Sequence, residues 1–130
     1  MREILFRGKR ADNGEWEYGD LWCNPYGKRV VCIVSPINDQ GTTGGNEVDP
    51  ETVCQFTGLH DKNGKKIFEG DIVKVDERIF DVVWDKNKAL FYLENRIVRE
   101  FADFYYYFGY DLEIIGNIHD NKLEDFENGC

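Results

Sequence analysis

The sequence predicts a mainly β protein, and both its composition and its pattern of apolar residues support this fold class. Of the 130 residues, 42% are hydrophobic and 15% are aromatic, which is ample material for a buried core. The chain has 13 glycines and only 3 prolines. Short apolar stretches recur with turn residues between them, which favours strands joined by tight turns over a helical bundle.

The N-terminal third predicts a β-hairpin followed by a buried strand. Residues 2–7 alternate as a strand does, and Asn13-Gly14 then predicts a turn because both residues tolerate positive φ. The next stretch resumes the two-residue period and places Trp16 and Tyr18 on one face. Residues 29–34 form an apolar, β-branched run, which indicates a buried strand.

Residues 35–50 predict a long loop, because glycine, proline, asparagine and aspartate dominate them. A loop of this length is either a mobile surface segment or a binding segment, and both alternatives stay open. The loop also predicts a boundary between an N-terminal β segment over 1–50 and a second part over 51–130 that ends in a short acidic tail. One continuous domain is the alternative.

The second half predicts further short strands at a spacing of roughly ten residues. They cover residues 52–56, 67–75, 79–84, 89–93 and 112–118. Asn63-Gly64 and Gly70-Asp71 predict turns, whereas residues 97–101 are ambiguous between a strand and a helical turn. From Asp71 onward, we expect a small five-stranded SH3-like barrel.

One long motif and both ends of the chain resemble a known family. Residues 51–73 read ETVCQFTGLHDKNGKKIFEGDIV and strongly resemble the YopX-like family. The opening residues 2–9, YGDL at 18–21 and EIIGNIHDN at 113–121 are similar to the start and end of its members. The resemblance implies a small protein of phages or prophages in Gram-positive hosts, with a β-rich fold that includes an SH3-like barrel. It implies no catalytic residues.

Much of this motif has a structural explanation. Asn63-Gly64 suits a turn, and Gly58 and Gly70 are expected to adopt backbone angles closed to other residues. Folding alone does not explain four polar residues, which we expect to lie on or near loops, where function concentrates. These candidate binding residues are Gln55, Thr57, Asp61 and Glu69.

Residues 101–110 contain seven aromatic side chains. Because side chains alternate along a strand, these rings cannot all share one face. One face holds Tyr105 and Tyr107, which we take as further candidate binding residues. The other, expected to fill the barrel, holds Phe104, Tyr106 and Phe108. The first set could be covered by the rest of the chain, by a second subunit or partner protein, or by stacked nucleic-acid bases.

The distribution of charge disfavours nucleic acid as the main partner. The net charge is −9, and residues 1–45 carry six basic and six acidic side chains, so the excess lies in 46–130. Only the N-terminal third could supply a basic patch, from Arg2, Arg7, Lys9, Arg10, Lys28 and Arg29. There is no run of about 18 apolar residues and no signal-peptide pattern, so we expect a cytoplasmic protein, in the host cell if a phage encodes it.

Signatures of catalysis are missing from the sequence. It has no phosphate-binding glycine loop, dinucleotide fingerprint or metalloprotease motif, and Ser35 is the only serine. The four cysteines are scattered, so we expect reduced thiols, no metal site and no cofactor, with Cys32 and Cys54 behaving as small buried hydrophobes.

Our first hypothesis is therefore a non-enzymatic module that binds a host or phage protein through the aromatic stretch and the 35–50 loop, with homo-oligomer formation as a further option. The alternatives are a nucleic-acid-binding small β-barrel and a carboxylate-dependent enzyme.

Overall fold

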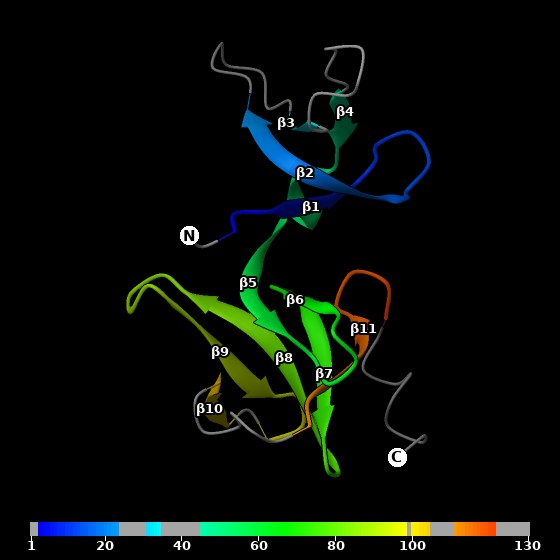
Figure 1. Cartoon of the computed structure of the whole chain (residues 1–130). Helices are drawn as coiled ribbons and strands as arrows, with labels where there is room; N and C mark the ends of the chain where they lie inside the picture. The colour runs from blue at the N-terminus through cyan, green and yellow to red at the C-terminus, as the bar shows by residue number, and fades with distance from the viewer. Residues whose placement is uncertain (1–2, 24–30, 35–44, 99, 105–110, 122–130) are drawn as a thin grey trace. The chain divides into compact units, whose positions relative to one another are not determined.

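A computed structural model of the chain describes residues 3–23, 31–34, 45–98, 100–104 and 111–121 (Figure 1). These residues form eleven β-strands and one short 3-10 helix, with no α-helix among them, and the strand pairs described below are antiparallel. The predicted mainly β class is confirmed. The chain divides into two compact units, Met1–Phe56 and Thr57–Cys130. Whether the predicted segments 1–50 and 51–130 fold separately stays a prediction.

The first unit is an antiparallel meander. Its strands are β1 (Phe6–Lys9), β2 (Trp16–Cys23), β3 (Val31–Val34) and β4 (Gly45–Val48), and the 3-10 helix η1 (Pro50–Thr52) follows them. The predicted hairpin is confirmed: Lys9 pairs with Trp16 and Arg7 with Tyr18. Trp16 and Tyr18 therefore share one face of the sheet, as expected.

Residues 45–48 correct the predicted 35–50 loop, because they form strand β4. Their composition suits a loop, but their backbone pairs with all four residues of β3, so Gly45 faces Val34 and Val48 faces Val31. The chain then returns to the end of β1, where Arg10 forms a bridge with Val48 and the Asp49 amide donates to the Lys9 carbonyl at 2.8 Å. Residues 35–44 of the predicted loop lie outside the described part of the chain.

The interior of the first unit is built around close backbone approach. Ile33 and Val48 are almost fully buried. A Cβ added at Gly8 would lie 3.0–3.3 Å from the side-chain carbons of Val48. Glycine at this position therefore lets β1 approach the Val48 side chain closely.

Strand β5 (Cys54–His60) belongs to both units along the chain. Its beginning pairs with β1, since Phe6 faces Gln55, and β5 is also hydrogen-bonded to β6 (Lys66–Phe68) in the second unit. Gly58 has a φ of 91° and Gly70, which precedes the next strand, has a φ of 85°. The expectation that these two glycines adopt angles closed to other residues is confirmed.

The second unit contains a five-stranded sheet in the order β10-β9-β8-β7-β11. Its strands are β7 (Asp71–Val75), β8 (Arg78–Asp85), β9 (Leu90–Asn95), β10 (Phe101–Asp103) and β11 (Glu113–Asn117). Five strands from Asp71 onward were expected, but as a closed barrel. The described sheet is open, because β10 pairs only with β9 and β11 only with β7.

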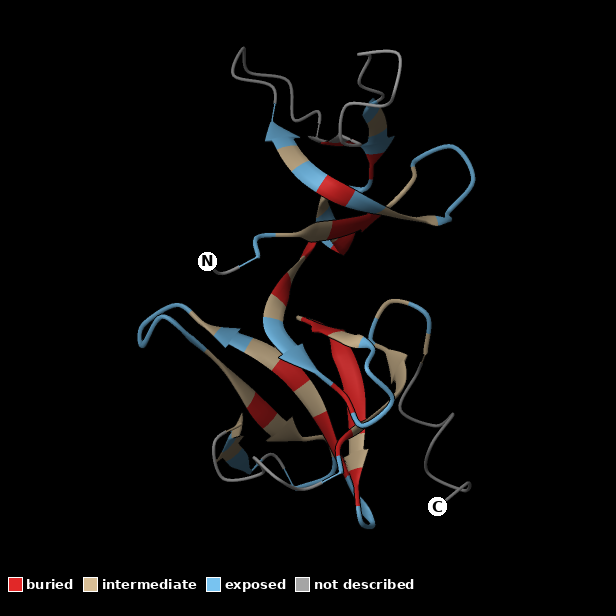
Figure 2. Ribbon diagram, in the orientation of Figure 1, coloured by how far each residue is buried: buried red, intermediate tan, exposed pale blue. Residues whose placement is uncertain are grey.

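The core residues of this sheet share one face, because Val73 pairs with Phe80 and Val82 pairs with Leu93. Figure 2 marks the buried residues along these strands in red. Ala102, Phe104 and Ile114 pack against it while remaining partly buried. The buried residues are Ile67, Val73, Val75, Phe80, Val82, Leu93 and Leu112. Phe104 therefore lies on the core side, as expected for its set of rings, whereas Tyr106 and Phe108 lie outside the described residues.

Candidate functional site

Asp61, one of the predicted binding residues, is a buried structural carboxylate. Asp61 is 7% exposed. Its carboxylate accepts hydrogen bonds from three backbone N–H groups, those of Asn63 at 2.8 Å, Lys65 at 2.9 Å and Ile114 at 3.1 Å. Burial raises the pKa of Asp61, but the three amide donors together lower it by more than burial raises it. The pKa of Asp61 is therefore below its ordinary value. The carboxylate thus ties the turn after β5 to β11.

The other three polar residues of the motif also lie within the folded structure. Gln55 and Thr57 are part of strand β5, not of a loop as expected. The Thr57 hydroxyl donates to the Ile67 carbonyl at 2.7 Å and accepts from the Leu59 amide at 3.2 Å. Glu69 is half-buried in the turn between β6 and β7. The contacts of Asp61 and Thr57 support a scaffold role for the motif, and ligand binding by the four residues stays a prediction.

The side chains of β10, at the start of the predicted aromatic stretch, alternate between the two faces of the five-stranded sheet. Ala102 lies opposite Leu93 and faces the core, whereas Phe101 and Asp103 lie opposite Glu94 and Tyr92 on the outer face. Phe101 is 67% exposed despite its large ring. Tyr105 and Tyr107 lie outside the described residues.

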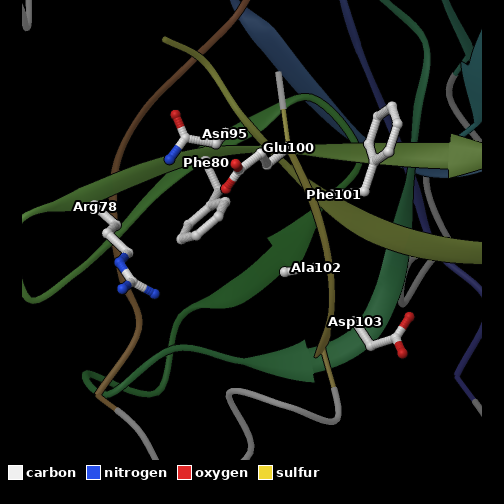
Figure 3. Close-up of a pocket in the computed structure, with 7 residues that line it drawn as sticks. All are labelled: Arg78, Phe80, Asn95, Glu100, Phe101, Ala102 and Asp103. Carbon is white, nitrogen blue, oxygen red and sulfur yellow. The ribbon is translucent and has the colours of Figure 1, made fainter. Parts of the chain in front are cut away.

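A pocket of about 440 Å³ opens on the core side of β10 (Figure 3). Phe80 forms its apolar part, and Arg78 and Glu100 bring opposite charges to it, while Phe101 and Asp103 point to the other side of the strand (Figure 3). The described lining is Arg78, Phe80, Asn95, Glu100, Phe101, Ala102 and Asp103. This pocket therefore combines a ring with groups of both charges.

A second pocket, of about 360 Å³, lies beside the same strand and we call it the outer pocket. Its described lining is Asp85, Lys88, Leu90, Tyr92, Phe101, Ala102 and Asp103. The rings of Tyr92 and Phe101 meet edge to face, with their centroids 5.2 Å apart. Burial raises the pKa of Tyr92, and the nearby carboxylates of Glu94 and Asp85 raise it further. The outer pocket is thus aromatic and lies in a negative field.

The first unit carries a different surface, which we call the β1–β2 face; Arg7 is buried in it at 6% exposure, and Lys9 and Trp16 are half-buried. On β1, the Arg7 guanidinium lies 4.6 Å and the Lys9 ammonium 5.5 Å from the centre of the Trp16 ring. Tyr18 and Trp22 follow on the same face of β2 and are each 48% exposed. This face therefore combines cations with aromatic rings.

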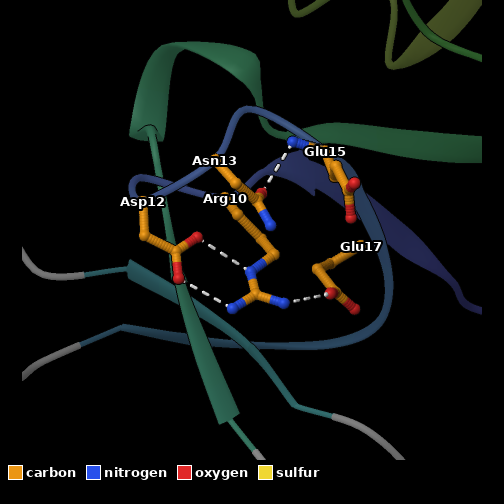
Figure 4. A network of polar contacts seen from close by, with 5 residues as sticks. All are labelled: Arg10, Asp12, Asn13, Glu15 and Glu17. Atoms are coloured by element: carbon orange, nitrogen blue, oxygen red, sulfur yellow. Dashed lines mark hydrogen bonds and ion pairs between the residues drawn. The ribbon is translucent and has the colours of Figure 1, made fainter.

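Arg10 does not join this face, although it was counted among the basic residues. Its guanidinium donates to Asp12 at 2.9 and 2.7 Å and to Glu17 at 3.4 Å (Figure 4). The hydrogen bond to Asp12 is the main reason that the pKa of Arg10 is raised and that of Asp12 lowered. Arg2, Lys28 and Arg29 lie outside the described residues, so of the six predicted basic residues only Arg7 and Lys9 are placed on the face.

Metal ligands and cysteines contribute little to these surfaces. Within the described ranges, no three His, Cys, Asp or Glu side chains gather as a metal site would require. Cys54 is buried, as expected, and Cys23 is exposed, and neither forms a disulfide. The Cys32 side chain lies outside the described part. Nor does that part contain a helix with the length and apolar character needed to cross a membrane.

Comparison with known proteins assigns the chain to a family. The YopX protein family matches residues 5–124, so the chain belongs to this family. The match covers both units and both surfaces described above. A search of curated proteins found no match.

Sequence reasoning missed the outer pocket. Leu90 and Tyr92 recur at the two-residue period of a strand, but on the face of β9 opposite to Leu93, which is in the core. That alternation was a detectable signal that the outer face is apolar. The approach of Asp85, Phe101 and Asp103 to this face depends on the register of three strands, which the sequence does not state.

Proposed function

We propose that this protein is a non-enzymatic interaction module, and that its second unit binds a partner protein through the surface around β10. The exposure of Phe101 between two pockets carries the proposal. A large exposed ring beside concave, partly apolar surface is the kind of feature that forms the centre of protein interfaces. The acidic side chains around it support a protein partner over a nucleic acid.

The family resemblance to phage and prophage proteins supports a host or phage protein as the partner, met in the cytoplasm of the host cell. The strand order β10-β9-β8-β7-β11 supports an SH3-like scaffold, because such barrels place a last strand beside the first strand of a four-stranded meander. An experimental structure of the chain tests this scaffold. A strand order in the second unit that differs from β10-β9-β8-β7-β11 would contradict it.

The partner is tested by affinity capture from infected host cells with two matched variants. Phe101→Ser removes the exposed ring, and Ile118→Ser removes an apolar side chain that is 47% exposed at the end of β11. We expect wild type and Ile118→Ser to retain the same protein and Phe101→Ser to lose it, with unchanged circular dichroism in all three. Capture of nothing specific, or equal capture by both variants, contradicts the proposal.

A second copy of the chain is the other occupant to consider. Light scattering of wild type and Phe101→Ser at about 100 µM, a concentration at which micromolar self-association is populated, distinguishes it. If wild type forms a dimer that Phe101→Ser dissociates, this surface binds a second copy of the chain and not a different protein. A monomeric wild type would exclude self-association through this surface.

Nucleic-acid binding is the second candidate function, and the β1–β2 face is the observation that favours it. Exposed rings can stack on bases, and Lys9 can approach phosphates. Fluorescence anisotropy with labelled single- and double-stranded oligonucleotides at low salt tests this, with Tyr18→Ser/Trp22→Ser as the variant. Absence of salt-sensitive binding below about 10 µM contradicts it, because even non-specific electrostatic binders reach micromolar affinity.

A further inference from the structure

We propose that the outer pocket accepts an arginine side chain of the partner protein. This inference rests on the proposed function and names the chemistry that the surface recognises. It concerns the outer face of β8, β9 and β10, where the pocket of about 360 Å³ lies. That volume is within the range of pockets that hold small ligands, so it is large enough for one long side chain.

The apolar part of the outer pocket suits a flat cation. Leu90, Tyr92 and Phe101 line it, and the two rings lie edge to face at 5.2 Å. A guanidinium is planar and weakly hydrated, and it stacks on aromatic rings more readily than a lysine ammonium does. The ring of Phe101 is accessible to such a group, because the residue is 67% exposed.

The polar part of the outer pocket supplies the matching charge. Asp103 lies directly opposite Tyr92 across the β9–β10 pair, and Asp85 lies opposite Leu90 across the β8–β9 pair. The two carboxylates therefore stand on either side of the apolar wall, and Lys88 is the single cation of the described lining. A carboxylate can accept two parallel N–H groups from one guanidinium, which gives arginine an orientation as well as affinity.

Other ligand classes fit this pocket less well. A phosphate or carboxylate ligand would meet two carboxylates against one ammonium, so charge opposes it. An apolar side chain would contact the rings but would take both carboxylates out of water without bringing a positive charge to them. Arginine satisfies the rings and the carboxylates together.

The test uses assigned amide NMR spectra of the full chain and two short peptides. The probe is acetyl-Gly-arginyl-Gly-amide, and its control replaces arginine with citrulline, which has nearly the same shape but no charge. We expect saturable shifts of the amides of Leu90, Tyr92 and residues 101–103 with the arginine peptide, and about tenfold weaker binding of the citrulline peptide. No saturation up to about 20 mM, beyond the millimolar range expected of a single side chain, would overturn the inference.

Two variants separate charge from stacking. Asp85→Asn/Asp103→Asn removes both charges, yet an amide oxygen at position 85 can still accept the amide groups of Asn87 and Lys88, as Asp85 does at 2.9 and 3.2 Å. We expect this variant to lose arginine binding, while Asp76→Asn, a matched change at an exposed turn, keeps it. Phe101→Leu keeps an apolar contact without a ring, and binding should weaken about threefold. Equal binding by the double variant and Asp76→Asn would refute the charge recognition.

The outcome is distinguishable from that of the proposed function. If Phe101→Ser loses the captured partner but the arginine peptide does not bind, the interaction surface stands and the arginine inference fails. If the arginine peptide binds while no partner depends on Phe101, the pocket chemistry stands and the proposed function fails. Equal binding of the arginine and citrulline peptides would show contact through the shared uncharged part of the side chain, and would overturn the inference.

Discussion

The two units of this protein bury their interiors in different ways. The second unit has a cluster of seven buried apolar residues, including Phe80 and Leu93, on one face of a five-stranded sheet. Among its described residues, the first unit has fewer large buried side chains, and there Gly8 lets β1 approach Val48 closely. Stability in the second unit should therefore depend on side-chain volume, whereas stability in the first should depend on the space left between strands.

The faces on which charged side chains meet aromatic rings differ between the two units as well. The β1–β2 face of the first unit joins Arg7 and Lys9 to aromatic rings, whereas the outer pocket of the second joins Asp85 and Asp103 to aromatic rings. The two faces therefore share aromatic rings and differ in the sign of the charge beside them. In our proposals that charge distinguishes the ligands, because it sets which of them are repelled on approach.

The largest effect is expected from the core of the second unit. Leu93→Ala removes a fully buried side chain and should lower the free energy of unfolding by about 3 kcal/mol. Urea unfolding in a Trp84→Phe background reports on the first unit through the fluorescence of Trp16 and Trp22, while circular dichroism reports on both units. We expect Leu93→Ala to lower the urea midpoint of the circular dichroism signal more than that of the fluorescence signal. Equal shifts would show that the two units unfold as one.

The next largest loss of stability is expected on replacing Asp61, because its carboxylate joins three backbone amides within the second unit. Asp61→Ala leaves these donors without their acceptor, at a cost of about 2 kcal/mol measured by the same urea titration. Asp76→Asn, in an exposed turn, is the control and should change little. A loss no larger than that of the control would remove Asp61 from the scaffold of the second unit.

The same carboxylate predicts a pH dependence. The folded-state pKa of Asp61 is lowered, so its contribution to stability is fully present above the unfolded value of about 3.9 and is lost as the pH falls below it. Wild type should therefore lose stability as the pH falls below about 4, and Asp61→Ala should lose less over the same range. Parallel pH profiles of the two proteins would contradict the assignment.

A smaller effect is expected from the close approach in the first unit. Gly8→Ala places a methyl group against Val48 and should lower the free energy of unfolding by about 1 kcal/mol. Val48→Ala removes two of the three contacting carbons, so the double variant Gly8→Ala/Val48→Ala should be less destabilised than the two single changes added together. Simple additivity would show that space at Gly8 does not limit the first unit.

The smallest effect is expected from the ion pairs on the surface of the first unit. Arg10 reaches Asp12 at 2.7 Å, but the Asp12 side chain is 65% exposed. Solvent and salt screen such a pair, so Arg10→Ala should leave the midpoint of unfolding unchanged within error. A clear drop that is suppressed in 0.5 M salt would show that this network (Figure 4) stabilises the first unit after all.

Local turn chemistry was predictable from the sequence because it depends on neighbouring residues. The Asn13-Gly14 and Asn63-Gly64 turns and the Gly70 corner follow from residues that tolerate positive φ, and the structure confirms them. Strand β4 was missed because Gly45 and Asn46 have loop-like side chains, and only pairing with distant β3 makes them a strand. Closure of a sheet is equally non-local, which is why a closed barrel was wrongly expected.

The candidate site was less predictable for the same reason. Phe101 was recognised as part of an aromatic stretch, but its exposure depends on which face of β10 meets the core. Gln55 and Thr57 were expected on or near loops, whereas β5 extends through both. In each case the surroundings of the residue depend on strand register, which the sequence does not state.

Strand β11 also has a consequence for the order in which the protein can assemble during synthesis. The hairpin of β1 and β2 joins close neighbours in sequence, whereas β11 pairs with β7, which is made some forty residues earlier, as in Glu113 opposite Lys74. Until the ribosome has passed residue 117, the edge of β7 has no strand beside it, Leu112 is missing from the core and Asp61 lacks the Ile114 amide. The growing chain therefore exposes an unpaired strand edge from the synthesis of β7 until that of β11, and such edges promote association with other chains.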